Sequence, residues 1–385
     1  LKNISMKKKL YTSIGLMSGT SMDGVDLSII SSDGYEVFSN IFDDYYEYDK
    51  NLQDELVRLR ELVSSKKDLL QNSKKLRELE RKLTLFHADA VNQSLKKYKD
   101  PIDLVGFHGQ TIFHNPKEKI TCQLGDGELL SQIIKKKVIY NFREADIQNN
   151  GQGAPLTPIF HYILSKKIYQ KYNIKFPIGF LNIGGIANAT KVINITDKIQ
   201  NNLFALDVGP GNCLIDEWVR NNSKKKFDKN GELALAGKID QLILNQAIDN
   251  FKIKSYAQSL DIKNFDVSFA RGLSLEDGCA TITNFTAYLI AQGLEYISQK
   301  KNIIFLVCGG GRKNINLIDC IKNYLINKNK INLEIIDNYN LNGDFIESQA
   351  FGFLAIRSFL NLPSSFKTTT GCEGSTVGGK LVKNF

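Results

Sequence analysis

Residues 14–30 read Ile14-Gly15-Leu16-Met17-Ser18-Gly19-Thr20-Ser21-Met22-Asp23-Gly24-Val25-Asp26-Leu27-Ser28-Ile29-Ile30, with apolar flanks around a centre of Gly, Ser, Thr and Asp. This pattern predicts two strands joined by a tight turn rather than a helix. The glycines let the backbone approach a ligand closely, and successive N–H groups with two hydroxyls suit an anion. An ordinary hairpin turn uses the same residue types, so the turn alone leaves both interpretations open.

Two acidic residues of this stretch, Asp23 and Asp26, would repel a phosphate by themselves. A Mg²⁺ ion between carboxylate and phosphate, bound directly or through water, explains their presence. The stretch is neither a Walker A loop, because no Gly-Lys-Ser/Thr follows, nor a GxGxxG motif leading into a helix. If the turn binds phosphate, it does so through neither of these two motifs.

Composition indicates an ordinary soluble globular protein that is large enough for two lobes: 385 residues, 42% hydrophobic and 24% charged. The net charge of +9 comes from scattered lysines rather than a basic patch with aromatics, so we expect no nucleic-acid partner. The six cysteines form no CxxC pair, as in many reduced cytosolic proteins. The apolar runs are too short to cross a bilayer, so we expect a cytoplasmic protein without a membrane partner.

The second half of the chain repeats the first in outline. Residues 180–192 again predict strand, glycine turn and strand, as expected of a duplicated nucleotide-binding architecture. The Gly/Pro stretch 151–158 is the predicted boundary. It separates an N-terminal lobe, 1–155, with the first hairpin and a helical insertion, from a C-terminal lobe, 156–385, with the second hairpin. Leucines at helical spacing predict two or three packed helices over 51–97.

Polar residues follow the predicted buried strand 102–107, where open α/β sheets place their ligands. They are His108, Gln110 and Thr111, although a structural role would also explain the histidine. Asp207 lies beside a Gly-Pro-Gly turn, which is a poor place for a core residue, and is therefore a candidate catalytic acid or base.

Further strands, helix starts and one more glycine turn are predicted in both halves of the chain. Three glycines, 309–311, follow the buried strand 303–308 and leave room for a flat group such as adenine. Asp126 either caps the helix that follows or faces the cleft, and Ser274 with Asp277 forms a candidate capping box. We also expect strands at 35–42 and 333–336, the latter as the last sheet strand. Glu347 begins a largely buried helix, where it would favour the helix dipole or contact a ligand.

Taken together, these stretches resemble the anhydro-N-acetylmuramic acid kinases, a branch of the actin-like and sugar-kinase superfamily. The matching motifs run in one order through nearly the whole chain: 15–26, 106–111 with His114, 123–127, Phe142-Arg143 with Asp146, 151–155, 181–188, 207–212, 308–311 and 347–351. Many short motifs in a fixed order are far more specific than any one of them.

The resemblance implies a duplicated, two-lobed α/β fold of the actin-like ATPase (ribonuclease H-like) type, with ATP in an interlobe cleft. The family phosphorylates 1,6-anhydro-N-acetylmuramic acid while opening its anhydro bridge with water. The products are N-acetylmuramic acid 6-phosphate and ADP, in the recycling of peptidoglycan and in amino-sugar catabolism. Members of the family tend to pair, so a homodimer is expected by resemblance.

The resemblance also implies roles for individual residues. Asp207 matches the family's catalytic base, and Asp23 and Asp26 are the expected Mg²⁺ ligands. The expected ATP contacts are Gly19, Thr20, Ser21, Met22, Asp23, Gly24, Val25, Asp26, Gly184, Gly185, Asn188, Gly209, Gly211, Asn212, Gly309, Gly310 and Gly311. The expected substrate contacts are His108, Gln110, Thr111, Arg143, Asp146 and Glu347. The planar fork of Arg143 suits the lactyl carboxylate, although a buried structural salt bridge would explain it equally well.

Three departures from the family pattern bear on substrate contacts more than on fold. Asn150 replaces a glycine, a basic residue often seen on either side of the motif at 258–263 is missing or displaced, and residues 368–371 lack preceding arginines. Two alternatives to this enzyme are a non-catalytic cytosolic sensor of cell-wall sugars and a kinase for another amino sugar. Asp207 argues against the sensor, because binding alone needs no base there.

Overall fold

The structure, a computed structural model, describes residues 9–196, 198–251, 255, 256, 258–260, 262–326 and 330–385. The chain divides into two compact units. The first unit contains the residues up to Leu164 together with Glu347–Lys367 and Gly371–Phe385. The second unit contains Ser165–Ile346 and Thr368–Thr370.

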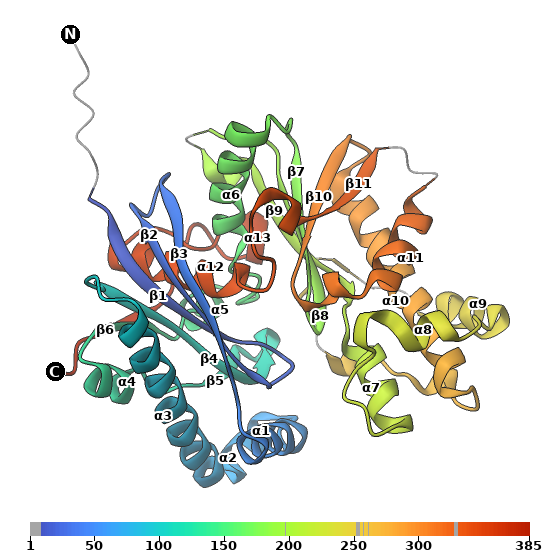
Figure 1. Cartoon of the computed structure of the whole chain (residues 1–385), viewed down its shortest axis with the longest axis horizontal. Coiled ribbons are helices and arrows are strands. Elements are labelled where there is room, and N and C mark those ends of the chain that lie inside the picture. The colour runs from blue at the N-terminus through green and yellow to red at the C-terminus, as the bar shows by residue number, and fades with distance from the viewer. Residues whose placement is uncertain (1–8, 197, 252–254, 257, 261, 327–329) are drawn as a thin grey trace. The chain divides into compact units, whose positions relative to one another are not determined.

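The first unit is built on a sheet with the strand order β12-β6-β4-β1-β2-β3, with β5 paired to β4 (Figure 1). Its strands are β1 (Tyr11–Ser18), β2 (Gly24–Ser32), β3 (Phe38–Glu47), β4 (Leu104–Asn115), β5 (Ile120–Leu124), β6 (Lys137–Tyr140) and β12 (Lys380–Val382). β1, β2 and β3 are antiparallel, whereas β4 runs parallel to β1 and β6 runs parallel to β4. The predicted strand at 35–42 is therefore displaced, because β3 begins at Phe38.

The second unit repeats this order as β11-β10-β7-β8-β9. Its strands are β7 (Ile178–Ile183), β8 (Ile186–Val192), β9 (Leu203–Pro210), β10 (Ile303–Cys308) and β11 (Ile331–Ile335). Again the first three are antiparallel and the last two are parallel. Two sheets with the same order and directions confirm the predicted duplicated α/β fold with a ribonuclease H-like sheet in each half. Both predicted hairpins are confirmed.

Helices cover the two sheets. The first unit has α1 (Lys50–Leu62), α2 (Lys66–Gln71), α3 (Ser73–Lys97), α4 (Gly127–Ile134), α5 (Glu144–Gln148) and most of α12 (Ile346–Phe359). The second unit has α7 (Cys213–Asn222), α8 (Glu232–Ala236), α9 (Gln241–Asn250), α10 (Leu275–Ser298) and α11 (Ile315–Leu325). Both α6 (Pro158–Tyr172) and α13 (Lys367–Thr370) span a boundary between the units. The three helices α1, α2 and α3 confirm the prediction for 51–97.

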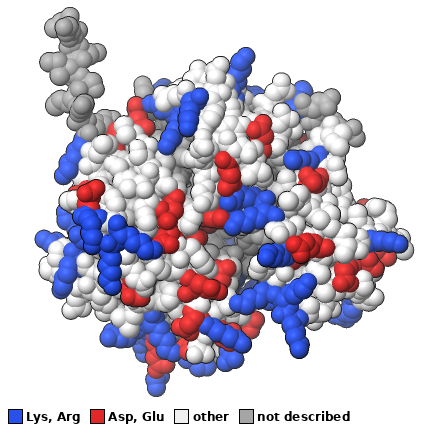
Figure 2. Space-filling view, in the orientation of Figure 1, with Lys and Arg blue, Asp and Glu red and all other residues white. Residues whose placement is uncertain are grey.

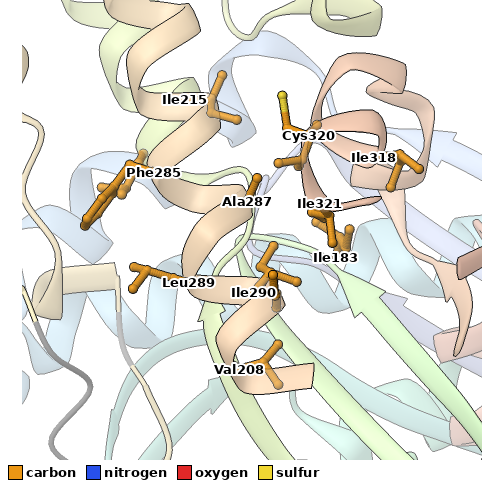
Figure 3. Packing of buried hydrophobic residues seen from close by; sticks show 14 of the residues in the cluster. Ile183, Val208, Ile215, Phe285, Ala287, Leu289, Ile290, Ile318, Cys320 and Ile321 are labelled. Atoms are coloured by element: carbon orange, nitrogen blue, oxygen red, sulfur yellow. The ribbon is translucent and has the colours of Figure 1, made fainter. Parts of the chain in front are cut away.

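The core of the second unit forms where α10 packs on the sheet. Ile290 of this helix lies on the side of Ile183 of β7 and Val208 of β9, whereas Phe285 and Leu289 point to another side of the helix and belong to the same buried cluster (Figure 3). Burial of such apolar side chains contributes roughly 1.5–3 kcal/mol each. Because this helix covers one face of the sheet, the alternate residues of each strand lie on the opposite face.

The predicted caps are confirmed. The Asp126 carboxylate accepts a hydrogen bond from the Leu129 N–H (2.9 Å) at the start of α4. Ser274 Oγ accepts from the Asp277 N–H (3.0 Å) at the start of α10. Within the described residues, no helix is long and apolar enough to cross a membrane. Acidic and basic side chains occur side by side over the visible face (Figure 2).

The division of the chain at 155/156 is wrong in one respect, because α12 and the C-terminal strand belong to the first unit. A Cβ atom added to Gly15 of β1 would lie 1.8 Å from the Ser348 carbonyl oxygen, and one added to Gly106 of β4 would lie 2.2 Å from that of Phe351. The backbone of α12 therefore rests directly on the sheet. β12 pairs with β6, so 333–336 is not the last sheet strand.

Burial of one lysine makes the stability of the second unit depend on pH. Lys191 of β8 is 1% exposed, and its Nζ donates to Gln299 Oε1 (2.9 Å). Burial, with a smaller contribution from Lys301, lowers the pKa of Lys191 to about 8. The unfolded chain keeps this proton up to its ordinary pKa of about 10.4, so it binds more protons than the folded chain between these values. The free energy of unfolding should therefore rise as the pH rises from about 8 to 10.5.

We expect Lys191→Met to raise the free energy of unfolding at neutral pH by about 1–3 kcal/mol, because it removes a charge from an apolar site. The difference from the wild type should shrink as the pH approaches 10.5, when both folded and unfolded wild-type chains lose the proton. Urea unfolding of both proteins at a series of pH values measures this difference in the free energy of unfolding. The exposed Lys224→Met is the control and should change stability by less than about 0.5 kcal/mol. A pH-independent difference would contradict the assignment.

Candidate functional site

In the turn between β1 and β2, the polar side chains are exposed and the one apolar side chain is buried. Met22 has a left-handed backbone (φ 54°) and a side chain that is 1% exposed within the core of the first unit. Thr20, Ser21 and Asp23 are exposed, and Ser21 Oγ donates to Asp23 Oδ1 (2.6 Å). The buried methionine thus anchors the turn, and any ligand contact of Met22 would come from its backbone.

Gln110 of β4 is buried beneath this turn and supports it through hydrogen bonds. Its Nε2 donates to the Gly19 carbonyl (3.0 Å), and its Oε1 accepts from Ser18 Oγ (2.6 Å). Ser18 also contacts the Tyr48 hydroxyl (2.8 Å), and the Arg60 guanidinium of α1 donates to the Thr20 carbonyl (3.1 Å). Gln110 is 1% exposed, so the structure places it behind the turn rather than on a surface open to substrate.

Sequence reasoning missed Ser18, Tyr48 and Arg60 as supports of the turn. The one available signal was a serine directly after the apolar residues 14–17.

The two proposed Mg²⁺ ligands lie close to the same tyrosine. Asp26 is paired in register with Tyr45 of β3, and burial together with the charges of Asp23 and Asp26 raises the pKa of Tyr45. The described residues contain no group of three or more His, Cys, Asp or Glu side chains that could hold a metal. Two carboxylates beside a phosphate-type turn nevertheless fit Mg²⁺, because this ion is usually held by one or two carboxylates, water and substrate phosphates.

His108 holds Arg143. The His108 Nε2 accepts from Arg143 Nε (3.1 Å) and Nη2 (2.9 Å), while its Nδ1 lies 2.8 Å from the Gly109 carbonyl and donates to it. Burial first, and then the Arg143 charge, hold the pKa of His108 well below its usual range. The imidazole is therefore neutral, and it orients the guanidinium without cancelling its charge. Arg143 Nη1 also donates to the Gly153 carbonyl (2.8 Å).

Asp146 shapes the loop that follows. Its carboxylate accepts from the Gly153 N–H (2.7 Å) and from Ser365 Oγ (2.5 Å), and its residue is 1% exposed. His114 Nε2 lies 2.9 Å from the Gln152 carbonyl. Arg143, His114 and Asp146 thus fix the loop 151–153. Asn150 has φ 61°, a backbone conformation that asparagine tolerates, so its replacement of glycine leaves the loop intact.

A cavity of about 360 Å³ lies in the first unit beside His108. Its polar lining includes Glu80, Thr121, Gln123 and Asn141. The Thr111 hydroxyl, another predicted substrate contact, accepts from Gln123 Nε2 (3.3 Å). The volume and the mixture of donors and acceptors suit a small polar ligand. Glu347 is half-buried in the first turn of α12.

In the second unit, two glycine turns are tied together by backbone hydrogen bonds. The Gly211 N–H donates to the Gly185 carbonyl (2.9 Å), and the Asn212 N–H donates to the Gly184 carbonyl (2.8 Å). Gly209 lies at the end of β9, next to this connection. The structure therefore brings the predicted ATP-contacting residues 184, 185 and 209–212 together.

Asp207 belongs to a polar row across the second sheet. The register pairs Cys308 with Asn182, Asn182 with Asn188, and Asn188 with Asp207. The neighbouring residues Leu181, Ala187, Ala189 and Val208 belong to the core under α10, so the row lies on the other face. Asp207 is 8% exposed, and its Oδ2 accepts from the Leu260 N–H (2.8 Å). In the segment 258–263, Asp261 lies outside the described residues.

Arg312 supports the glycine turn after β10. Gly309 has φ 78°, which favours glycine, and its carbonyl accepts from Arg312 Nη1 (3.1 Å). The guanidinium is 7% exposed and pairs with Asp337 (2.7 Å) and Asp344 (2.6 Å). Burial opposes its charge, yet the hydrogen bonds that it donates to these two carboxylates raise the pKa of Arg312 above its ordinary value. Sequence reasoning missed this support, because neither aspartate lies near the turn in sequence.

Two matching sheets with glycine-containing hairpin turns, and in the second unit a carboxylate in a polar row on the sheet that carries the second turn, are typical of a phosphotransferase of the duplicated α/β class. A sequence model described as anhydro-N-acetylmuramic acid kinase matches residues 11–384. The chain belongs to this family. It is therefore a kinase that uses ATP and acts in the metabolism of cell-wall amino sugars.

Curated relatives support the assignment along the whole chain. The chain is 52% identical to the anhydro-N-acetylmuramic acid kinase of Pelagibacter ubique (strain HTCC1062), over 98% of this chain and 100% of the relative. It is 38% identical to that of Rhodopseudomonas palustris (strain ATCC BAA-98 / CGA009), over 97% and 100%. Among solved structures, the activator of the 2-hydroxyisocaproyl-CoA dehydratase from Clostridium difficile with bound ADPNP matches with a TM-score of 0.41 and 11% identity, over 91% of this chain and 96% of that one.

Proposed function

We propose that this chain transfers the γ-phosphoryl group of ATP to 1,6-anhydro-N-acetylmuramic acid while water opens the anhydro bridge. The products are N-acetylmuramic acid 6-phosphate and ADP. Family membership supports the reaction, and the observation that carries the residue assignment is the position of Asp207. The carboxylate is buried, accepts a hydrogen bond from the Leu260 N–H and lies on the sheet face that α10 does not cover, which supports a role as the base for a water molecule.

In the proposed reaction, the Asp207 carboxylate takes a proton from water as the water oxygen bonds to the anomeric carbon. The bond between that carbon and the bridging oxygen breaks, and its electron pair stays on the 6-oxygen. This oxygen attacks the γ-phosphorus, and the bond to the β–γ bridging oxygen breaks to release ADP. The proton on Asp207 then passes to solvent, so one base serves ring opening and transfer.

For ATP, we propose contacts from the turn of the first unit, residues 19–24 and Asp26, and from the glycine turns of the second unit at 184–185, 209–212 and 309–311. Val25, also expected to contact ATP, is 0% exposed and lies in the core of the first unit, so it is left out. Asp23 and Asp26 would hold Mg²⁺, which supplies charge neutralisation to the phosphates. Backbone N–H groups of the turns would orient the phosphate chain without a change of protonation.

For the sugar, we propose that Arg143 binds the lactyl carboxylate and that Glu347 contacts a hydroxyl. The neutral His108 supports the first assignment, because it fixes the plane of the guanidinium while leaving its positive charge. Asp146 would act indirectly, by holding the loop 151–153. We also propose a cytoplasmic location, where ATP is available, and a homodimer, which light scattering after gel filtration would test.

The test of the function is incubation of the protein with ATP, Mg²⁺ and 1,6-anhydro-N-acetylmuramic acid, followed by mass spectrometry. We expect N-acetylmuramic acid 6-phosphate in equal amount to ADP. In ¹⁸O-labelled water, the label should appear at the anomeric hydroxyl and not in the phosphate. Product without label in the sugar would contradict ring opening by water.

A variant of Gln110 tests the support of the first turn. In Gln110→Glu, a carboxylate oxygen replaces the amide nitrogen that donates to the Gly19 carbonyl at 3.0 Å. The carboxylate oxygen and the carbonyl oxygen are both acceptors, so this hydrogen bond is lost. Loss of a buried hydrogen bond costs about 1–3 kcal/mol, so we expect the KM for ATP to rise roughly 5- to 100-fold. Steady-state kinetics with each substrate varied in turn measures the effect.

The control for this experiment is Gln93→Glu, an exposed position on α3, which should leave both KM values within about twofold. A Gln110→Glu variant with a higher KM for the sugar and an unchanged KM for ATP would instead support the prediction that Gln110 contacts substrate.

A further inference from the structure

One buried acceptor lies next to the proposed base without a hydrogen-bond donor. Asn188 Oδ1 is buried and accepts no hydrogen bond from the described residues. Such atoms are uncommon in folded proteins and call for an explanation. The register pairs Asn188 directly with Asp207 on the neighbouring antiparallel strand, which places the two side chains together on one face of the sheet.

The local backbone gives this pair its position. The register of β8 and β9 shifts between Ala187 and Asn188, so Val208 is the extra residue of a bulge. Val208 points into the core toward α10 (Figure 3), and Asp207 and Asn188 are left opposite each other on the other face. Bulges are frequent beside active sites because they redirect a side chain.

The chemistry of the pair restricts what can lie against it. An ionised Asp207 offers only acceptors, so it cannot satisfy the Asn188 oxygen. A single atom that bonds to both side chains must donate two hydrogen bonds. Water does this, and its lone pairs are then directed away from the two acceptors. That is the orientation a nucleophilic water needs when a base takes one of its protons.

We propose that Asn188 Oδ1 and the Asp207 carboxylate together bind the water that opens the anhydro bridge. Asp207 takes one proton of this water, and Asn188 holds the other hydrogen, which stays on the new anomeric hydroxyl. The bond from the water oxygen to the anomeric carbon forms as the bond from that carbon to the bridging oxygen breaks. The assignment rests on the proposed function and moves Asn188 from the ATP contacts expected from the sequence to the hydrolytic step.

Methanol distinguishes this role from a structural one. Methanol has a single O–H, so it can donate to Asp207 only if its methyl group faces the Asn188 oxygen. The wild type should therefore form N-acetylmuramic acid 6-phosphate almost exclusively in aqueous methanol. In Asn188→Ala, the acceptor is gone and space is opened, so we expect the fraction of methyl glycoside 6-phosphate to rise about 5- to 10-fold.

Turnover of Asn188→Ala in water should fall roughly 10- to 100-fold, with the KM for ATP unchanged. Asn188→Asp keeps an acceptor and should retain the preference for water, although its second negative charge beside Asp207 slows the reaction. Thr190→Ser, on the same strand and face, is the control for disturbance of β8 and should match the wild type in product ratio.

Liquid chromatography with mass spectrometry gives the ratio of the two products. An unchanged ratio in Asn188→Ala, with an active wild type, would overturn the assignment of Asn188 alone. A raised KM for ATP with normal turnover and ratio would also overturn it and return Asn188 to the nucleotide. Failure of the wild type to form any sugar phosphate would overturn the proposed function and this assignment with it.

Discussion

Asp207→Asn should lower the rate of sugar phosphate formation by about 10³-fold or more, because a positioned base contributes roughly 10²–10⁴-fold and here serves both steps. The amide has the shape of the carboxylate, and its oxygen can still accept from the Leu260 N–H, so the fold around it should be retained. Without a base, neither ring opening by water nor formation of the attacking 6-oxygen is assisted.

Two measurements separate lost chemistry from lost binding. ATP affinity, measured by calorimetry, should stay within about twofold of the wild type, because the change affects a step after binding. Asp240→Asn, at the N-cap of α9, is a matched control, since asparagine caps helices as well as aspartate does. Turnover near the wild-type rate in Asp207→Asn would remove Asp207 from its proposed role.

Gly15→Ala should cost more than about 4 kcal/mol of stability, a large part of the 5–15 kcal/mol typical of a folded protein. The added Cβ would lie 1.8 Å from the Ser348 carbonyl oxygen and 2.4 Å from the Gly352 nitrogen. Both are backbone atoms of α12, so no side chain can turn aside. The helix must move off the sheet, and the contacts of α12 with β1 are lost.

Urea unfolding measures this cost, and soluble yield replaces it if the variant does not fold. Gly310→Ala is the control for stability, because a Cβ there meets no atom within 4 Å, and it should change the free energy of unfolding by less than about 1 kcal/mol. Gly106→Ala should resemble Gly15→Ala, since its Cβ would meet the Phe351 carbonyl. A Gly15→Ala protein as stable as the wild type would show that α12 does not pack on β1 at this distance.

The elements predicted best were those defined by residues close together in sequence. Alternating apolar residues around a glycine turn gave both hairpins, and Ser274 with Asp277 defined the start of α10. The strand at 303–308 followed from an apolar run before three glycines. In each case the local pattern and the tertiary structure favour the same conformation.

The features that were missed depend on residues far apart in sequence. Gln110 and Gly19 are 91 residues apart, and nothing in either sequence neighbourhood indicates that the glutamine supports the turn. The buried Arg312 pairs with Asp337 and Asp344, which are 25 and 32 residues away, and the local charge pattern predicts neither pair. The three-residue strand β12 is too short to give a periodic signal. The residue types at the site were predictable, whereas their hydrogen-bond partners were not.

The return of α12 and β12 to the first unit has a consequence during synthesis. The glycine-lined surface of β1 and β4 is made early, but the helix that covers it follows the last strand of the second unit. On the ribosome, the glycine-lined face of the N-terminal sheet therefore stays uncovered until some 350 residues have been synthesised. Each unit combines segments that are separated in sequence, so a single truncation of the gene yields neither unit. A chain terminated before α12 would lack the helix that covers β1 and β4.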